Sequence, residues 1–185
     1  MTSLYLIRHA YAKWTPDENR PLSKQGWEGA VKLAELLVDQ GINHIISSPA
    51  RRAIQTAEPL AVQMKLAIQH DPRFRERELG DWTASSFEEA IRHTWDDMDF
   101  AYPNGETNRV AQSRALQALT EVLMGHPVDH VLISTHGNLL ALMLKHYLPR
   151  VDFSFWQMLT IPDAYHLEIV REEVMYYSRI WNEVT

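Results

Sequence analysis

Arginine and histidine stand side by side at Arg8-His9, directly after the apolar run Leu4-Tyr5-Leu6-Ile7. A short run of branched and aromatic residues is typical of a buried strand. The end of such a strand is where an open α/β sheet presents its ligand-binding groups. A guanidinium beside an imidazole at that point could bind an anion and provide a nitrogen nucleophile. The pair therefore indicates anion chemistry near the beginning of the chain.

A second histidine occupies a matching place later in the chain. Val131-Leu132-Ile133-Ser134 is again apolar, and Thr135-His136-Gly137 follows it. Gly137 permits close approach of the backbone to a ligand, and the start of the next helix offers free N–H groups to an anion. A single histidine at a strand end is most often structural, so it is the matching pair that favours a site.

Two further segments could complete such a site. Residues 47–57 contain Arg51 and Arg52 at the start of an expected helix, where one guanidinium could point at an anion held over the sheet. Periodicity alone leaves open which arginine faces inward, and both could be solvated. Residues 73–82 carry the dense mixed charge of a solvated loop. They also contain Glu76, a carboxyl that could protonate a leaving oxygen.

The elements that must position these residues alternate between strand and helix patterns. We expect helices that begin near Ser23, at Ser48-Pro49, at a Ser85–Glu88 capping box, at Thr107 and after His136. We expect strands at 4–7, 44–47, 131–134, 155–161, 165–170 and 174–181. This order favours an α/β fold of three layers, α/β/α, with a mainly parallel central sheet to which the last strands add antiparallel pairs. Residues 1–185 are expected to form a single domain.

Composition excludes several classes of protein. The chain has no cysteine, which rules out disulfides, thiolate metal sites and cysteine nucleophiles. Its formal net charge of −6 argues against a nucleic-acid partner. We see neither a signal peptide nor an apolar stretch long enough for a bilayer, so we expect a cytoplasmic protein without a membrane partner. Asp96, Asp97 and Asp99 favour a solvated helix end, and no ligand spacing is seen among His126, His130, His146 and His166.

Four motifs, taken in order, resemble those of the histidine phosphatase superfamily, whose fold is phosphoglycerate-mutase-like. They are Leu6-Ile7-Arg8-His9-Ala10, the stretch from Ser48 to Ala57, the stretch from Glu76 to Trp82, and Ser134-Thr135-His136-Gly137. Arg20-Pro21-Leu22-Ser23 with Gly26 is similar to a stretch of the shorter members. The comparison selects Arg52, directly before Ala53-Ile54, as the inward arginine.

The resemblance implies a phosphatase that hydrolyses a small phosphomonoester through a phosphohistidine and releases inorganic phosphate. His9 would attack phosphorus, while Arg8, Arg52 and His136 would hold the three equatorial oxygens. Glu76 would give a proton to the departing alkoxide and then take one from the attacking water. Neither a metal nor another cofactor is expected, because the cationic side chains take that role.

The chain departs from the family pattern around the substrate. Tyr11 stands where mutases and several phosphatases carry an acid, and Thr15 stands where an asparagine often helps to bind phosphate. These departures and the short chain disfavour a mutase. Trp14, Tyr11 and Trp82 could line an apolar pocket near the phosphate, or could be ordinary packing. Thr15 and Gly137 are also expected to bind the substrate.

Three other functions remain open. The chain could be a phosphoglycerate-type mutase, a protein-phosphohistidine phosphatase, or a module of a different class that binds a phosphorylated ligand without catalysis. Glu106 resembles a family position with a structural role, in helix capping or in support of the phosphate-binding groups. The sequence does not determine the natural substrate or the oligomeric state.

Overall fold

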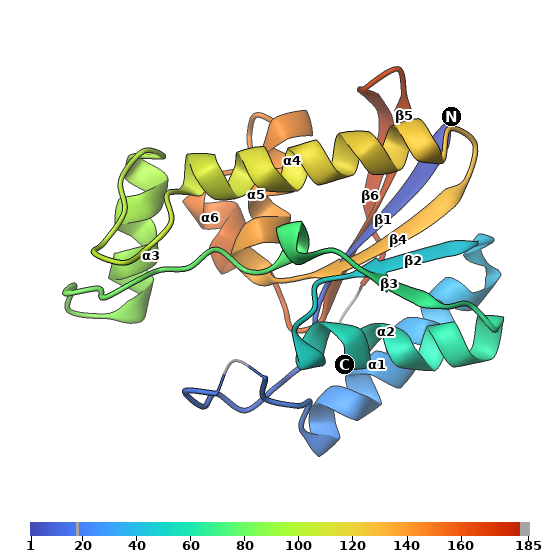
Figure 1. Cartoon of the computed structure of the whole chain (residues 1–185), viewed down its shortest axis with the longest axis horizontal. Coiled ribbons are helices and arrows are strands. Elements are labelled where there is room, and N and C mark those ends of the chain that lie inside the picture. The colour runs from blue at the N-terminus through green and yellow to red at the C-terminus, as the bar shows by residue number, and fades with distance from the viewer. Residues whose placement is uncertain (18, 182–185) are drawn as a thin grey trace.

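Strands from both ends of the chain meet in one mixed sheet (Figure 1). The computed structural model describes residues 1–17 and 19–181, and within them six strands pair in the order β3-β2-β4-β1-β5-β6. The first four in that order are parallel, whereas β5 pairs antiparallel with β1 and with β6. The strands are β1 (Thr2–Arg8), β2 (His44–Ser47), β3 (Ile68–His70), β4 (His130–Thr135), β5 (Asp163–Val170) and β6 (Glu173–Arg179).

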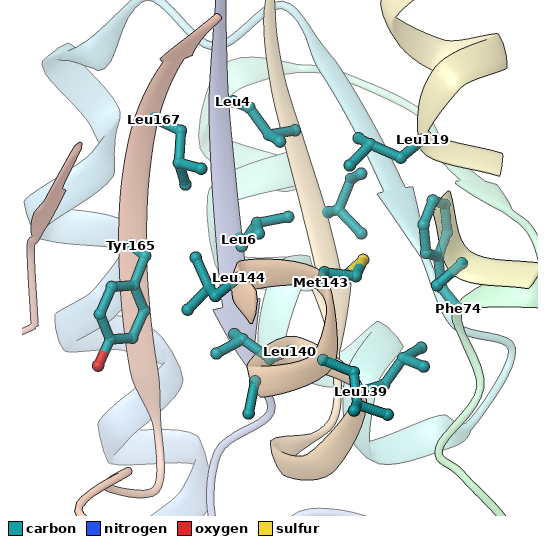
Figure 2. Packing of buried hydrophobic residues seen from close by; sticks show 14 of the residues in the cluster. Leu4, Leu6, Phe74, Leu119, Leu139, Leu140, Met143, Leu144, Tyr165 and Leu167 are labelled. Atoms are coloured by element: carbon teal, nitrogen blue, oxygen red, sulfur yellow. The ribbon is translucent and has the colours of Figure 1, made fainter. Parts of the chain in front are cut away.

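Helices cover both faces of the sheet, which gives the three layers expected from the sequence (Figure 1). One face packs against α1 (Lys24–Leu37) and α2 (Arg51–Met64) through apolar side chains such as Leu33, Leu60 and Ile45. The other face packs against α4 (Asn108–Gly125) and α5 (Gly137–Tyr147), and Figure 2 shows Leu6 of β1 beside Leu144 of α5. The shorter helices α3 (Phe87–Asp96) and α6 (Phe153–Gln157) pack against each other beyond one end of the sheet.

The parallel strands bring distant segments to one edge of the sheet. Arg8 pairs with Thr135, and Ser47 pairs with Ser134. The residues that directly follow β1, β2 and β4 therefore emerge side by side. This is the edge at which α/β sheets bind ligands.

Local signals placed most of these elements correctly. Ser23 caps α1 by accepting from the N–H of Gly26, and Thr107 caps α4 by accepting from the N–H of Val110. Gly41 ends the turn after α1 with a positive φ of 70°, which glycine adopts without strain. No helix among the described residues is both long and apolar enough to cross a bilayer.

Three local predictions were wrong, and one strand was missed. Residues 155–161 do not form a strand, because Asp152 caps a short helix there by accepting from the N–H of Phe155 at 3.0 Å. Strand β3 was missed because it has only three residues, none of them fully buried. The helix start expected at Ser85 lies one residue later, where Ser86 accepts from the N–H of Glu89 at 3.1 Å. Ser48 does not cap α2, which begins at Arg51.

Candidate active site

His9 lies just beyond the end of β1 and is held in one orientation. Its backbone N–H donates to the carbonyl of Thr135 at 2.9 Å. Its Nδ1 lies 2.8 Å from the carbonyl oxygen of Ala10, and because a carbonyl can only accept, Nδ1 carries the ring proton. Nε2 therefore presents a lone pair, which accepts from Nε of Arg52 at 3.2 Å. A fixed imidazole with an unprotonated nitrogen is what nucleophilic attack requires.

The surroundings of His9 keep its imidazole neutral. Its pKa is lowered from the ordinary 6.5 to about 3, first by burial and then by the charge of Arg52. Arg8 and Arg20 act in the same direction, and only the hydrogen bond to Ala10 opposes them. The lone pair on Nε2 is thus available throughout the neutral pH range.

Arg52 joins the two histidines of the site. It lies in the first turn of α2, is only 8% exposed, and contacts Nδ1 of His136 with Nη2 at 3.1 Å while Nε faces His9. Thr56 ties this arginine to the strand end, since its Oγ1 donates to the carbonyl of Arg52 at 2.7 Å and accepts from the N–H of Ala10 at 2.8 Å. Of the two arginines that periodicity could not separate, Arg52 faces inward and Arg51 is exposed.

His136 is buried at the start of α5, next to His9. The two ring centroids are 5.2 Å apart with the rings nearly perpendicular. Because Arg52 donates to Nδ1, the remaining nitrogen Nε2 carries the proton and donates to Oγ of Ser48 at 2.8 Å. Burial, followed by the neighbouring His9 and Arg52, lowers the pKa of His136 well below 6.5. The hydroxyl of Ser48, expected to cap a helix, thus serves as the partner of a catalytic-site imidazole instead.

Arg8 packs flat against the first residue of α5. A Cβ placed on Gly137 would lie 2.8 Å from both Nε and Cζ of Arg8, so only glycine leaves room for this guanidinium. Nη1 donates to the carbonyls of Leu159 and Thr160 at 3.0 and 3.2 Å. Burial lowers the pKa of Arg8, and the negative charge of Glu76 opposes this effect.

Glu76 lies at the same edge of the sheet, with its carboxylate at the start of α5. Oε2 accepts from the N–H of Asn138 at 3.0 Å, and Oε1 accepts from the N–H groups of Leu139 and Arg77 at 3.0 and 2.8 Å. An acidic side chain at this position offers acceptors to the free N–H groups of a helix N-terminus. The carboxyl that the sequence marked as a proton donor is therefore an acceptor of three backbone hydrogen bonds in this arrangement.

An arginine from α4 holds the segment that carries Glu76. Arg114 donates to the carbonyls of Arg75 and Glu76 at 2.9 and 3.2 Å and to that of Arg73. Its other donors form a paired contact with the Glu106 carboxylate at 2.7 and 2.8 Å. Burial acts to raise the pKa of Glu106, but hydrogen bonds and charge from Arg114 hold it below its ordinary value. Glu106 thus supports the site through Arg114.

Two arginines near the site were quoted in motifs but given no role. Arg20 contributes charge to both His9 and His136, and its Nε is buried without a hydrogen-bond partner among the described residues. Arg77 is buried although its segment has the charge pattern of a solvated loop, and the charges of Glu76 and Glu106 lie close to it. The signal for Arg20 was the motif itself, whereas nothing in the sequence pattern marks Arg77 as buried.

The outer positions expected to bind substrate are spread around the site. Thr15 lines a surface hollow of about 430 Å³ together with Lys13 and Arg20. Trp14 is 73% exposed. Trp82 lies instead against Phe87 at the start of α3, with ring centroids 6.3 Å apart. A substrate role for Tyr11, Trp14, Thr15 and Trp82 stays a prediction.

Comparison with known proteins identifies the family. The sequence pattern of the histidine phosphatase superfamily, branch 1, matches residues 4–183. The chain is 31% identical over 143 residues to the uncharacterized phosphatase PhoE of Bacillus subtilis, which covers 74% of this chain and 72% of that protein. It is 32% identical over 159 residues to the probable phosphoglycerate mutase GpmB of Proteus mirabilis, with 78% and 74% covered.

Solved structures share the fold over nearly the whole chain. A mycobacterial glucosyl-3-phosphoglycerate phosphatase in complex with VO3 has a TM-score of 0.80 at 23% identity and covers 97% of this chain and 98% of its own. Bacillus stearothermophilus YhfR has a TM-score of 0.76 at 25% identity, with 94% of each chain covered. The sheet order, the paired histidines at its edge and the match over residues 4–183 lead to one conclusion: the chain belongs to the histidine phosphatase superfamily.

Proposed function

We propose that this protein is a phosphatase that hydrolyses a small phosphomonoester by way of a phosphohistidine on His9, without a metal ion in the reaction. One observation carries the proposal. Nδ1 of His9 carries the ring proton, so Nε2 keeps a lone pair, which accepts from Nε of Arg52, and the charges of Arg52, Arg8 and Arg20 act on this imidazole. A neutral nucleophile inside a group of cations matches an anionic electrophile such as a phosphate dianion.

The proposed reaction has two displacements. In the first, Nε2 of His9 forms a bond to phosphorus, the ester P–O bond breaks, and the leaving oxygen takes a proton. In the second, water attacks phosphorus, the P–N bond breaks, and the proton of the water returns to the protein. Splitting one difficult displacement in this way lowers the barrier for phosphate monoesters, which are among the slowest substrates to hydrolyse uncatalysed.

The buried guanidinium groups support a phosphate ligand. Nε of Arg8 and Nε of Arg20 are buried and lack a hydrogen-bond partner within residues 1–17 and 19–181. An unmet buried donor costs about 1–3 kcal/mol, and a phosphate oxygen would supply the acceptor. Charge in a loose phosphoryl-transfer transition state is spread over the equatorial oxygens, where such donors are most effective.

Ser48 can hydrogen-bond to either tautomer of His136. At present Nε2 of His136 donates to the hydroxyl of Ser48. When Arg52 turns toward phosphate, Nδ1 of His136 becomes available to donate to a phosphate oxygen, and Nε2 can accept from the same hydroxyl. A hydroxyl both donates and accepts, so His136 keeps this hydrogen bond in either tautomer.

Glu76 is the proposed proton donor to the leaving oxygen. Its carboxylate accepts from three backbone N–H groups, two at Oε1 and one at Oε2, so a lone pair of Oε2 is left to carry the proton that the first displacement needs.

Names of related proteins favour a small phosphorylated substrate. Structures of the same fold include a mycobacterial glucosyl-3-phosphoglycerate phosphatase with inorganic phosphate and a phosphoserine phosphatase of Entamoeba histolytica with phosphoserine. Both ligands are phosphorylated molecules of low molecular weight or the phosphate product itself. We therefore assign this chain the same class of substrate.

The nucleophile can be tested with a generic aryl phosphate in the presence of EDTA. We expect the His9→Asn variant to fall to the background rate, because it removes the nitrogen that would accept the phosphoryl group. His146→Asn, which removes an exposed histidine of α5, is the matched control and should keep full activity. Rapid quenching should trap a phosphorylated wild-type protein, with the label on His9. Full turnover by His9→Asn, or loss of all activity with EDTA, would refute the proposal.

The role of Glu76 can be read from the leaving group. Glu76→Gln should slow esters of alcohols by about 10²–10⁴-fold while sparing aryl esters, whose leaving oxygen needs no proton. If both classes of substrate slow equally, Glu76 instead acts by holding the start of α5, and the proton must come from elsewhere.

A mutase is the second candidate, because several relatives of 27–36% identity are named probable phosphoglycerate mutases. A mutase would need a bisphosphorylated primer and would transfer phosphate between two positions of one substrate. Dependence of activity on such a primer would favour it. Turnover of phosphohistidine alone would favour a protein-phosphohistidine phosphatase, and phosphate binding without any label on His9 would favour a binding module.

A further inference from the structure

We propose that His44, His126 and Asp129 form a binding site for a divalent transition-metal ion of the zinc type, at the opposite end of the sheet from His9. His44 is the first residue of β2, and the other two lie in the turn between α4 and β4. Figure 1 shows this turn beside the amino terminus. The length of β4, about 20 Å, separates the cluster from the active-site edge.

Two of the three pairs of donor atoms already lie at the spacing that a metal ion needs. Oδ2 of Asp129 is 3.2 Å from Nε2 of His44 and 2.9 Å from Nδ1 of His126. All three donor atoms lie within 4.8 Å of one another. Ligand bonds of about 2.0–2.2 Å put neighbouring donors about 2.9–3.5 Å apart in octahedral or tetrahedral sites. An ion can therefore replace the two bridging protons without a large rearrangement.

The carboxylate is held with one oxygen facing the imidazoles. Oδ1 of Asp129 accepts from the side-chain amide of Asn43 at 3.0 Å, which leaves Oδ2 directed at the two histidines. The amide oxygen of Asn43 in turn accepts from the N–H of His130 at 3.0 Å. Metal-ligating carboxylates in proteins are supported by hydrogen bonds of this kind.

The backbone that carries the three ligands is also fixed. His44 pairs with Val131 in the sheet, and the N–H of Ser3 donates to the carbonyl of Asp129 at 3.0 Å. The carbonyl of His126 accepts from the hydroxyl of Thr2 at 2.9 Å. The ligands thus project from paired strands and a tied turn, which limits the entropy lost when an ion binds.

The ligand set selects the class of ion. Two imidazole nitrogens and one carboxylate oxygen suit Zn²⁺, Co²⁺, Ni²⁺ or Cu²⁺, whereas Ca²⁺ and Mg²⁺ prefer oxygen ligands alone. The side chains are 24–33% exposed, so an ion can enter and water can complete its coordination. An ion there would join the start of β2 to the turn after α4, two segments far apart in the sequence.

Spacing along the chain could not reveal this cluster. His126 and Asp129 are three residues apart, but His44 arrives from another strand, so no local ligand motif exists. The ligand spacing of this cluster is therefore not visible along the sequence. The alternative is that Asp129 accepts a hydrogen bond from each of the two histidines and that no ion binds.

The test uses the untagged full-length protein, stripped with EDTA and then freed of chelator. We expect Co²⁺ to bind with one equivalent per chain and to give a visible d–d absorption that Zn²⁺ abolishes. Zn²⁺ at about 100 times its dissociation constant should raise the thermal midpoint by about 5–10 °C. His126→Asn and Asp129→Asn should lose both signals, and Asn43→Ser should weaken binding about 10–100-fold.

Two controls separate this site from the active site. His146→Asn should bind like wild type. His9→Asn removes a nitrogen that could also bind a transition metal, and it should keep the cobalt signal. Aryl phosphate hydrolysis by His126→Asn should equal that of wild type in EDTA. Absence of binding, binding unchanged by His126→Asn and Asp129→Asn, or binding lost in His9→Asn would overturn the inference while leaving the proposed phosphatase intact.

Discussion

Each ring nitrogen of the two active-site histidines has a defined partner. Ala10 and Ser48 accept the two ring protons, and Arg52 donates to the nitrogen that remains on each ring. The arrangement makes both imidazoles neutral, which suits a nucleophile and a neighbouring donor to phosphate. It also lowers the free energy of unfolding in acid, because a histidine in the unfolded state binds a proton that the same histidine does not bind in the folded state.

The acid sensitivity of folding should follow from His9. Its folded pKa of about 3 lies below the unfolded value of 6.5, so the unfolded state binds more protons between these values. The free energy of unfolding therefore falls as pH falls from about 6.5 toward 3, and His9 should account for about 2 kcal/mol of the loss between pH 7.5 and pH 5. His136 acts in the same direction.

Urea unfolding of wild type and His9→Asn at both pH values measures this contribution. Asparagine is neutral at every pH, so the variant should lose about 2 kcal/mol less than wild type on acidification. His146→Asn should behave like wild type. An identical loss in wild type and His9→Asn would mean that His9 is protonated in the folded protein.

At the scale of the elements, the site depends on how closely helices approach the strand ends. The start of α5 touches Arg8 at Gly137, and α4 reaches across to the segment before Glu76 through Arg114. Both contacts are between elements that are distant in sequence. Each has a chemically equivalent residue elsewhere in the chain that lacks the contact and so provides a matched control.

Gly137→Ala should displace the Arg8 guanidinium, because the new Cβ would lie 2.8 Å from Nε and Cζ of that side chain. We expect kcat/KM for an aryl phosphate to fall by about tenfold or more, the value of one hydrogen bond to a charged group. Gly125→Ala, whose Cβ would meet nothing within 4 Å, should leave activity unchanged. Equal activity in the two variants would show that Arg8 is free to move without loss of function.

Arg114→Met should destabilise the protein by about 3 kcal/mol, because it leaves the Glu106 carboxylate and three carbonyls without their partner. Arg109→Met, on the same helix, breaks an ion pair with Asp99 whose side chains are 60% and 62% exposed, and it should cost far less because solvent screens that pair. Denaturant unfolding compares the two. The double variant Glu106→Gln with Arg114→Met should recover part of the loss, and no recovery would argue against the Glu106 contact as its source.

At the scale of the whole molecule, a cationic site is set in a chain of net charge −6. Its affinity for phosphate must come from the local arginines and not from the overall field. The active site and the cluster of His44, His126 and Asp129 occupy opposite ends of the same parallel strands. Ligands at the two ends should therefore stabilise the fold independently.

Inorganic phosphate should stabilise the wild-type protein by binding only the folded state. At about 100 times the dissociation constant we expect the thermal midpoint to rise by about 5–10 °C. Arg52→Met should show little or no shift, while Arg51→Met, which removes the exposed neighbour, should respond like wild type. A phosphate shift that survives Arg52→Met would place the anion elsewhere on the protein.

Local patterns predicted much of this fold because their causes are local. The apolar run at 131–134 marks β4, and the hydroxyls of Ser23 and Thr107 mark helix starts, since each cap bonds an N–H three residues away. The run at 155–161 was wrongly predicted to be a strand, because aromatic and branched residues occur both in buried strands and in short packed helices. Strand β3 has too few residues for any period to be visible.

What the sequence alone determined is most of the strands and helices in their order, together with the four motifs, and these were enough to predict that His9, Arg52 and His136 meet. Only the tertiary structure decided which proton each imidazole carries, that Ser48 serves His136, that Glu76 binds the start of α5, and that His44 joins His126 and Asp129. The physical reason is range. Strand and helix signals arise between residues a few positions apart, whereas burial and hydrogen-bond partners at a strand end depend on distant segments that pack there.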